Sequence, residues 1–165
     1  MAAPVPQPVG RPDRPPATEG VHRLRVRYCE CDPMGVVHHA AYVPWLEEGR
    51  TELLRTSGVS YRQLESAGVF LAVVKLEAAY KRPGRYDDLV EVRTRVVGAT
   101  RVKLRHEYEV RLVERAGVSE GEMVGLQRAG LDLLVTASTT LACLDGAGKP
   151  SELPGWIAGG GGGGG

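Results

Sequence analysis

Residues 28–42 read YCECDPMGVVHHAAY, and this stretch decides the fold prediction. It lies between a predicted strand at residues 22–29 and a predicted amphipathic helix at residues 42–57. It holds two acids, two histidines, two cysteines and a Pro-x-Gly turn. Because the amino end of a helix presents unpaired N–H groups and a partial positive charge, a loop in this place suits a binding or catalytic site.

Outward from this loop, the sequence pattern predicts one helix and several strands. The helix prediction rests on residues that recur at helical spacing: Tyr42, Trp45, Leu46, Gly49 and Leu53. Pro44 fits its first turn and Gly58 its end. Alternating or continuous apolar runs predict further strands over residues 69–81, 89–97, 102–112 and 131–144. Together these elements make an α+β arrangement.

The 165 residues suit one domain, which we expect at residues 21–157. Residues 1–20 contain six prolines and predict a disordered segment, and residues 158–165 predict a flexible glycine tail. A net charge of +1 gives no sign of a nucleic-acid partner. We expect no membrane span and no secretory signal. The odd, low count of three cysteines favours the cytoplasm.

The loop at residues 28–42 allows more than one interpretation. Asp32 before a proline, with a glycine three residues later, is typical of an ordinary turn, and the adjacent histidines would then be surface or capping residues. A metal site would use Cys29, Cys31, His38 and His39. These residue types suit zinc, but Cys-x-Cys followed by adjacent histidines is not a usual zinc spacing, so we expect no metal.

The same stretch resembles hotdog-fold acyl-CoA thioesterases of the 4-hydroxybenzoyl-CoA thioesterase and Tol–Pal-associated group. The matching residues are Tyr28, Asp32, Gly35, Val36, Val37, His39 and Tyr42. The resemblance continues in LEEGRTELLR at residues 46–55 and YKRPGRYDDLVEV at residues 80–92. It departs from the family at Glu30, where aspartate is usual, at Cys31, where threonine is common, and at residues 116–130. We predict that this longer segment forms an extended hairpin or a mobile loop.

The resemblance implies an antiparallel sheet of about five strands wrapped around one central helix. It also implies thioester hydrolysis without a cofactor, with Asp32 as nucleophile or general base. The backbone N–H of His39 would polarise the carbonyl. Residues implied in substrate binding are Gly35, Val36, Val37 and Tyr42 beside the acyl group, and Arg101 and Lys103 at the nucleotide. For Tyr42, the helical spacing favours core packing against the sheet over substrate contact. Lys81, Arg82 and Arg85 lie in another candidate loop for the nucleotide.

Two other functions stay open on the same fold. One is a different reaction on an acyl thioester, such as dehydration. The other is a non-catalytic module that binds acyl-CoA, because fold does not dictate function. In each case one helix covers only part of one sheet face and leaves the sheet edges open. We therefore expect a homodimer or a dimer of dimers.

Overall fold

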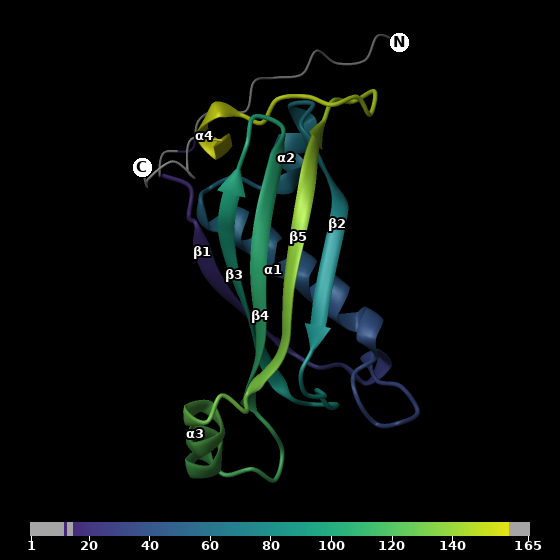
Figure 1. Ribbon diagram of the computed structural model, residues 1–165, viewed down its shortest axis with the longest axis vertical. Coiled ribbons are helices and arrows are strands. Elements are labelled where there is room, and N and C mark those ends of the chain that lie inside the picture. The colour runs from purple at the N-terminus through teal and green to yellow at the C-terminus, as the bar shows by residue number, and fades with distance from the viewer. Residues whose placement is uncertain (1–11, 13–14, 159–165) are drawn as a thin grey trace.

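The computed structural model describes residue 12 and residues 15–158 of the chain (Figure 1). The predicted disorder of residues 1–11 and 13–14, and the predicted flexibility of residues 159–165, lie outside the described residues. The elements are β1 (Glu19–Arg25), η1 (Tyr28–Glu30), η2 (His39–Ala41), α1 (Tyr42–Thr56), α2 (Tyr61–Ser66), β2 (Phe70–Tyr80), β3 (Leu89–Ala99), β4 (Lys103–Glu114), α3 (Glu120–Arg128), β5 (Leu133–Leu144) and α4 (Gly155–Ala158).

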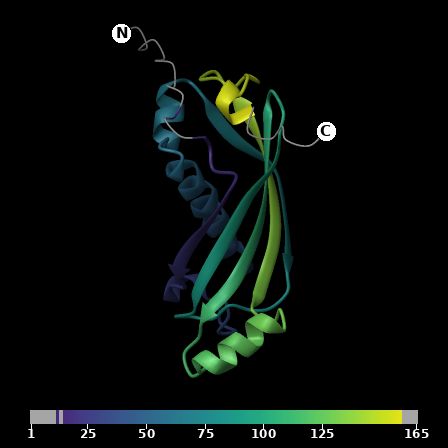
Figure 2. The ribbon, with the colours of Figure 1, turned by 90° about the vertical axis from the view of Figure 1, so that its left-hand side faces the viewer.

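The five strands form one antiparallel sheet in the order β1-β3-β4-β5-β2. Helix α1 lies along one face of this sheet, as the turned view in Figure 2 shows. The arrangement confirms the α+β class and the hotdog fold. No helix among the described residues has the length and apolar composition needed to cross a bilayer. Strands β1 and β2 are the two edges, and β2 comes directly after the helical segment.

Helix α1 packs on the sheet through the side chains that its spacing predicted. Trp45, Leu46 and Leu53 are buried against the sheet. Gly49 lies where the helix comes closest to β3: a Cβ atom there would be 2.6 Å from Thr94 Oγ1 and 2.9 Å from Val92 Cγ1. Only a residue without a side chain fits this contact, which sets the spacing between helix and sheet.

Two predicted boundaries in the first strand are wrong. The strand was predicted at residues 22–29, but β1 runs from Glu19 to Arg25 and so begins before the expected domain start. Residues 28–30 form the short helix η1 instead of continuing the strand, and the Tyr28 side chain is 80% exposed. The chain must turn here to reach the start of α1, which ends its pairing with β3 at Leu89.

The segment at residues 116–130 is neither an extended hairpin nor a loop without structure. It contains α3, whose first turn is capped by Ser119: the Ser119 Oγ accepts a hydrogen bond from Glu122 N, and the Glu122 side chain accepts one from Ser119 N. Met123 is buried in the main core. A helix with a capped start and one buried side chain therefore closes one end of the sheet (Figure 1).

Candidate functional site

A tight turn holds the residues around Asp32. The backbone of Cys31 pairs with that of Val37. Within this bridge, Asp32 N donates to Val36 O at 2.9 Å, and Gly35 N donates to Asp32 O at 2.9 Å. Gly35 has φ +76°, a conformation that glycine adopts without strain. The turn is therefore fixed at both of its ends, and it holds the backbone of Asp32 in one place.

The two carboxylate oxygens of Asp32 have different surroundings. Oδ1 accepts a hydrogen bond from Met34 N at 2.9 Å, which is the turn role that the sequence allowed. Oδ2 accepts no hydrogen bond from the residues that the structure describes. The side chain is half-buried. Asp32 thus has a structural role through one oxygen, and its second oxygen is unpaired among the described residues.

At the start of the central helix, the backbone amide of His39 has no partner among the described residues. His38 caps the short helix η2: its Nδ1 accepts a hydrogen bond from Ala40 N at 3.1 Å, and its carbonyl accepts one from Ala41 N at 2.9 Å. The His39 N–H between them donates to no acceptor within residues 15–158. The His39 carbonyl is held by the Tyr80 hydroxyl at 3.0 Å. The imidazole of His39 is exposed and stacks on that of His38.

Glu30, which the sequence marked only as a departure from the family, anchors this loop to α1. It is buried, and it accepts hydrogen bonds from Trp45 Nε1 at 2.9 Å, Arg27 N at 2.7 Å and Arg27 Nη2 at 2.8 Å. Burial alone would raise the pKa of Glu30, but the hydrogen bonds from Arg27 and Trp45 outweigh it and lower the pKa. Sequence spacing could not reveal this contact, because it joins residues 15 positions apart.

Tyr42 and Val37 are buried and join the Asp32 loop to the β2–β3 loop. Val37 N donates to Gly84 O at 2.9 Å, and Gly84 N donates to the Tyr42 hydroxyl at 3.2 Å. Tyr42 is 3% exposed, and burial raises the pKa of its hydroxyl. The packing role that the sequence left open for Tyr42 is therefore present. Of the other two residues implied at the acyl group, Val36 is half-buried and Gly35 exposed.

The structure separates the two groups of basic residues. Arg101 and Lys103 lie at the β3–β4 turn, at the far end of the sheet from the Asp32 loop (Figure 1). The length of β3 puts about 35 Å between the two ends. Arg101 is 78% exposed and pairs with Glu152 at 3.5 Å. The segment Lys81–Arg85, in contrast, includes Gly84 and so lies against the Asp32 loop within the same chain.

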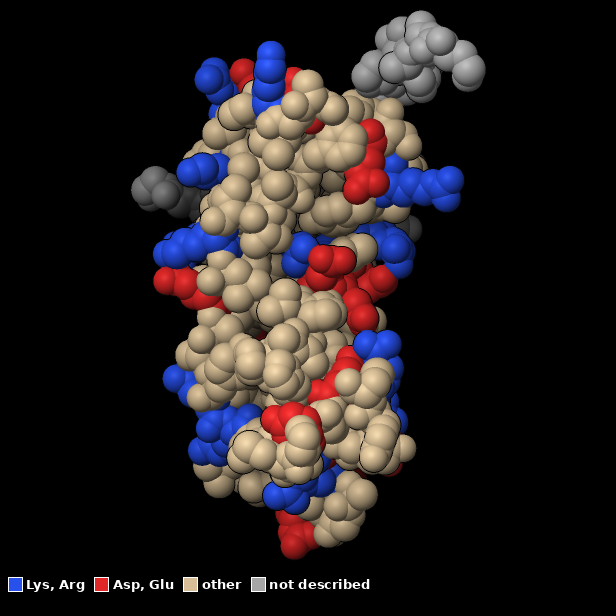
Figure 3. Space-filling model, turned by 90° about the vertical axis from the view of Figure 1, so that its right-hand side faces the viewer, with Lys and Arg blue, Asp and Glu red and all other residues tan. Residues whose placement is uncertain are grey.

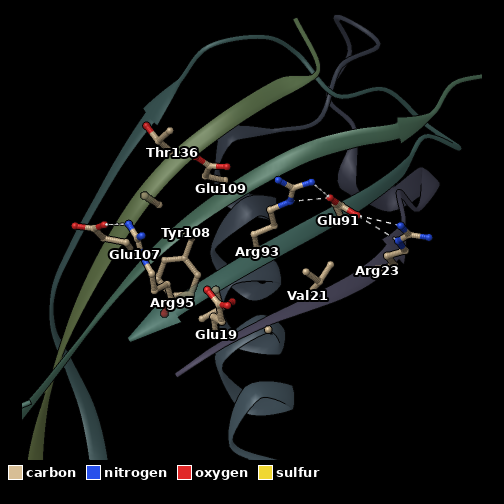
Figure 4. A pocket seen from close by; sticks show the side chains of 13 residues that line it. Glu19, Val21, Arg23, Glu91, Arg93, Arg95, Glu107, Tyr108, Glu109 and Thr136 are labelled. Atoms are coloured by element: carbon tan, nitrogen blue, oxygen red, sulfur yellow. Dashed lines mark hydrogen bonds and ion pairs between the residues drawn. The ribbon is translucent and has the colours of Figure 1, made fainter. Parts of the chain in front are cut away.

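A broad hollow of about 1150 Å³ lies on the sheet face opposite α1, between β1 and β5. Five of its charged side chains pair with one another: Glu91 with both Arg23 and Arg93, and Glu107 with Arg95 (Figure 4). Glu109 pairs with Arg111, and the Glu19 carboxylate forms no ion pair with the described residues. Asp32 does not line it.

The four residues considered for a metal site do not form one cluster. Cys29 is exposed and Cys31 is half-buried, and burial raises the pKa of the Cys31 thiol. His38 Nδ1 is used as a helix cap. Within the described part of the chain, no group of three or more His, Cys, Asp or Glu side chains is placed to hold a metal ion.

Comparison with known proteins adds to this geometry. A sequence profile described as the Thioesterase-like superfamily matches residues 26–160. YneP of Bacillus subtilis (strain 168) is 37% identical over 87 residues, which are 53% of this chain and 63% of YneP, so the match spans less than two thirds of that protein. The acyl-CoA thioester hydrolase YbgC of Escherichia coli O6:H1 is 33% identical over 101 residues, which are 61% of this chain and 75% of YbgC.

Solved structures extend the similarity over most of the chain. The hypothetical protein TT1821 of Thermus thermophilus is 35% identical with a TM-score of 0.69, covering 85% of this chain and 95% of that one. The DHNA-CoA thioesterase of Staphylococcus aureus is 29% identical with a TM-score of 0.69, covering 82% of this chain and 80% of that one.

Proposed function

Because the chain belongs to the Thioesterase-like superfamily, we propose that it hydrolyses acyl-CoA thioesters with Asp32 and the His39 backbone N–H as its catalytic groups. One observation carries the proposal: in one short loop, an oxygen of the half-buried Asp32 carboxylate and a helix-start amide both lack a partner among the described residues. Thioester hydrolysis needs these two functions, an activated nucleophile and a donor to the carbonyl oxygen.

The His39 N–H would donate to the thioester oxygen, where negative charge develops as the carbonyl carbon is attacked. The partial positive charge of the helix start adds to this stabilisation. Asp32 Oδ2 could attack that carbon, giving a mixed anhydride and coenzyme A thiolate, and water would then open the anhydride. Alternatively, Oδ2 takes a proton from a water that attacks directly. In both routes the C–S bond breaks, and the products are a carboxylic acid and the coenzyme A thiol.

The active unit in this proposal is a homodimer formed through β2, and a dimer of dimers could be built from it. Strand β2 is a sheet edge with exposed apolar side chains: Phe70, Val73, Val74, Leu76 and Tyr80. Figure 3 views the molecule from this side, and much of the surface there is free of charged side chains. An uncovered apolar edge strand is a pairing site for a second chain.

A two-fold axis at β2 would also complete the site. Antiparallel pairing of two β2 strands would bring the β3–β4 turn of a second copy to the end of the dimer where Asp32 lies. In this arrangement Lys81, Arg82 and Arg85 of one chain, with Arg101 and Lys103 of the second copy, are the cations for the phosphates of coenzyme A. We place the enzyme in the cytoplasm, where its three free cysteines would stay reduced.

Release of free thiol from acyl-CoA tests the proposed reaction. The purified full chain is mixed with a panel of aromatic and aliphatic acyl-CoAs, and the new thiol is measured with a thiol-reactive dye. We expect turnover of at least one member of the panel. Dehydration of the acyl group without thiol release would identify a different reaction. Tight acyl-CoA binding without turnover would identify the binding module.

A further inference from the structure

A small cavity lies between the second half of α1, the sheet and the terminal segments, about 12 Å further along α1 than Tyr42. We call it the Arg50 cavity. It is lined by residues from α1, α2, β4 and α4, among them Arg50, Tyr61, His106 and Trp156. Its volume is about 50 Å³. The close packing of Gly49 on Val92 and Thr94 lies between this cavity and the helix start, so it is distinct from the Asp32 loop.

Three side chains that line the Arg50 cavity carry polar atoms without a partner. These atoms are Arg50 Nε, His106 Nδ1 and Trp156 Nε1, and each is buried with no hydrogen bond to the described residues. Arg50 is 8% exposed and His106 is 3% exposed. Buried polar atoms in folded proteins almost always have a partner, so three orphans around one cavity indicate an occupant.

The chemistry of these atoms limits what the occupant can be. The N–H groups of Arg50 and Trp156 can only donate hydrogen bonds, so they cannot satisfy each other. Burial, together with the charge of Arg50, lowers the pKa of His106 to about 4, so its imidazole is neutral and its Nδ1 either donates or accepts, depending on the tautomer. Tyr61 adds a hydroxyl. The occupant must therefore be a hydrogen-bond acceptor.

The charge of the lining residues and the volume of the cavity restrict the possible occupant further. The described lining includes no aspartate or glutamate, and Arg50 is its one charged side chain. The guanidinium bonds through Nη2 to Glu47 at 3.1 Å, but the Glu47 carboxylate is 68% exposed and so compensates the buried charge poorly. One water molecule takes up roughly 30 Å³ in the liquid, which is less than the volume of the cavity. The cavity therefore has room for one ion of a few atoms.

We propose that the Arg50 cavity binds one small monovalent anion, such as chloride or formate, on Arg50 Nε and Trp156 Nε1. The ion would link α1 to α4 and to β4, beside residues 16–18, which also line the cavity. Because the site lies away from Asp32, its effect would be on the stability of the fold. This inference does not depend on the proposed hydrolysis.

Thermal unfolding measures the proposed binding. The melting temperature is compared in chloride, bromide and gluconate at equal ionic strength, because gluconate is too large for the cavity. We expect chloride and bromide to raise the melting temperature by about 3 °C at concentrations well above the dissociation constant. Arg50→Met should abolish the difference between the salts. Equal melting temperatures of the unmodified protein in all three salts would mean that only water fills the cavity.

Bromide also reports on the position of the ion, and its detection in crystals needs no variant that could fail to fold. Crystals grown in bromide should show an anomalous peak within hydrogen-bond distance of Arg50 Nε. In solution, bromide should quench Trp156 fluorescence saturably, and Trp156→Phe should remove the saturable part. Peaks confined to surface lysines and arginines, with quenching that rises linearly, would overturn the proposal.

Discussion

Single residues of the Asp32 loop both hold the loop in place and carry a group for the proposed reaction. One carboxylate oxygen of Asp32 holds the turn by accepting from Met34 N, and the other has no partner among the described residues. A carboxylate fixed through one oxygen loses little freedom when it reacts through the other, so the turn orients the group that would act. The same division occurs at His38 and His39, where the His38 side chain caps the helix start and the His39 amide has no acceptor in the described part of the chain.

His39 allows the amide and the imidazole to be tested separately. His39→Pro removes the N–H, and proline is well tolerated at the first position of a helix. His38 before it has φ −61° and ψ 137°, which suits a residue that precedes proline. His39→Ala removes the imidazole and keeps the N–H. We expect His39→Pro to lower kcat about 100-fold or more, as loss of an oxyanion donor does.

His39→Ala is the matched control for this measurement and should keep most of the activity. Steady-state thiol release is compared for both variants, with circular dichroism to check the fold. Equal losses in the two variants, or a larger loss in His39→Ala, would assign the role to the imidazole instead of the amide.

At the scale of elements, the approach of α1 to β3 depends on Gly49. We expect Gly49→Ala to destabilise the protein by about 2 kcal/mol, because the new methyl group meets Thr94 Oγ1 and Val92 Cγ1 inside van der Waals distance. Gly125→Ala in α3 is the control. No atom lies within 4 Å of its Cβ position, and alanine favours a helix by about 1 kcal/mol over glycine.

Urea unfolding of both variants gives the two free energies of unfolding. We expect Gly49→Ala to be less stable than the unmodified protein, and Gly125→Ala to be equally or more stable. A Gly49→Ala variant with unchanged stability would show that the helix can move away from the sheet at no cost.

Elements with a strong local pattern were predictable, and those that depend on distant contacts were not. The α1 helix follows from its apolar spacing, and β3 and β4 follow from alternation. The helix α3 has a Ser-x-x-Glu start but only one fully buried residue, Met123, so periodicity did not reveal it. In the site, the resemblance singled out Asp32 and His39, whereas the contacts of Glu30 need three-dimensional placement.

At the scale of the whole molecule, the exposed edge β2 predicts the oligomeric state. Val74 is 57% exposed on this edge. We expect Val74→Lys to convert the proposed dimer to a monomer, because a lysine in an apolar pairing surface would have to lose its hydration. Val124→Lys on α3 is the control, since this valine is also exposed but lies on another element.

Light scattering after size-exclusion chromatography gives the mass of each variant. The unmodified chain and Val124→Lys should have two or four times the mass of one chain, and Val74→Lys half the mass of the unmodified assembly or less. A monomeric unmodified chain would contradict the proposed dimerisation through β2.

The stability of the whole fold should also depend on His106. Its pKa is lowered to about 4 by burial and by the nearby charge of Arg50, against 6.5 in the unfolded chain. Between these values the unfolded chain binds the proton and the folded chain does not, so stability falls as the pH drops from 6.5 to 4. The loss attributable to this group is at most roughly 3 kcal/mol.

His106→Gln removes this titration, and its unfolding free energy should change less between pH 7 and pH 4.5 than that of the unmodified protein. Denaturant unfolding at a series of pH values measures the difference. Parallel curves for the two proteins would show that His106 is protonated in the fold.

Hydrolysis by Asp32→Asn tests the central claim most directly. Asparagine keeps the shape of the side chain and an oxygen to accept from Met34 N, so the turn should survive. The amide neither attacks a thioester nor accepts a proton from water, so kcat for thiol release should fall by about 100-fold to 10,000-fold with an unchanged melting temperature. A folded Asp32→Asn variant that releases coenzyme A at the unmodified rate would contradict the account.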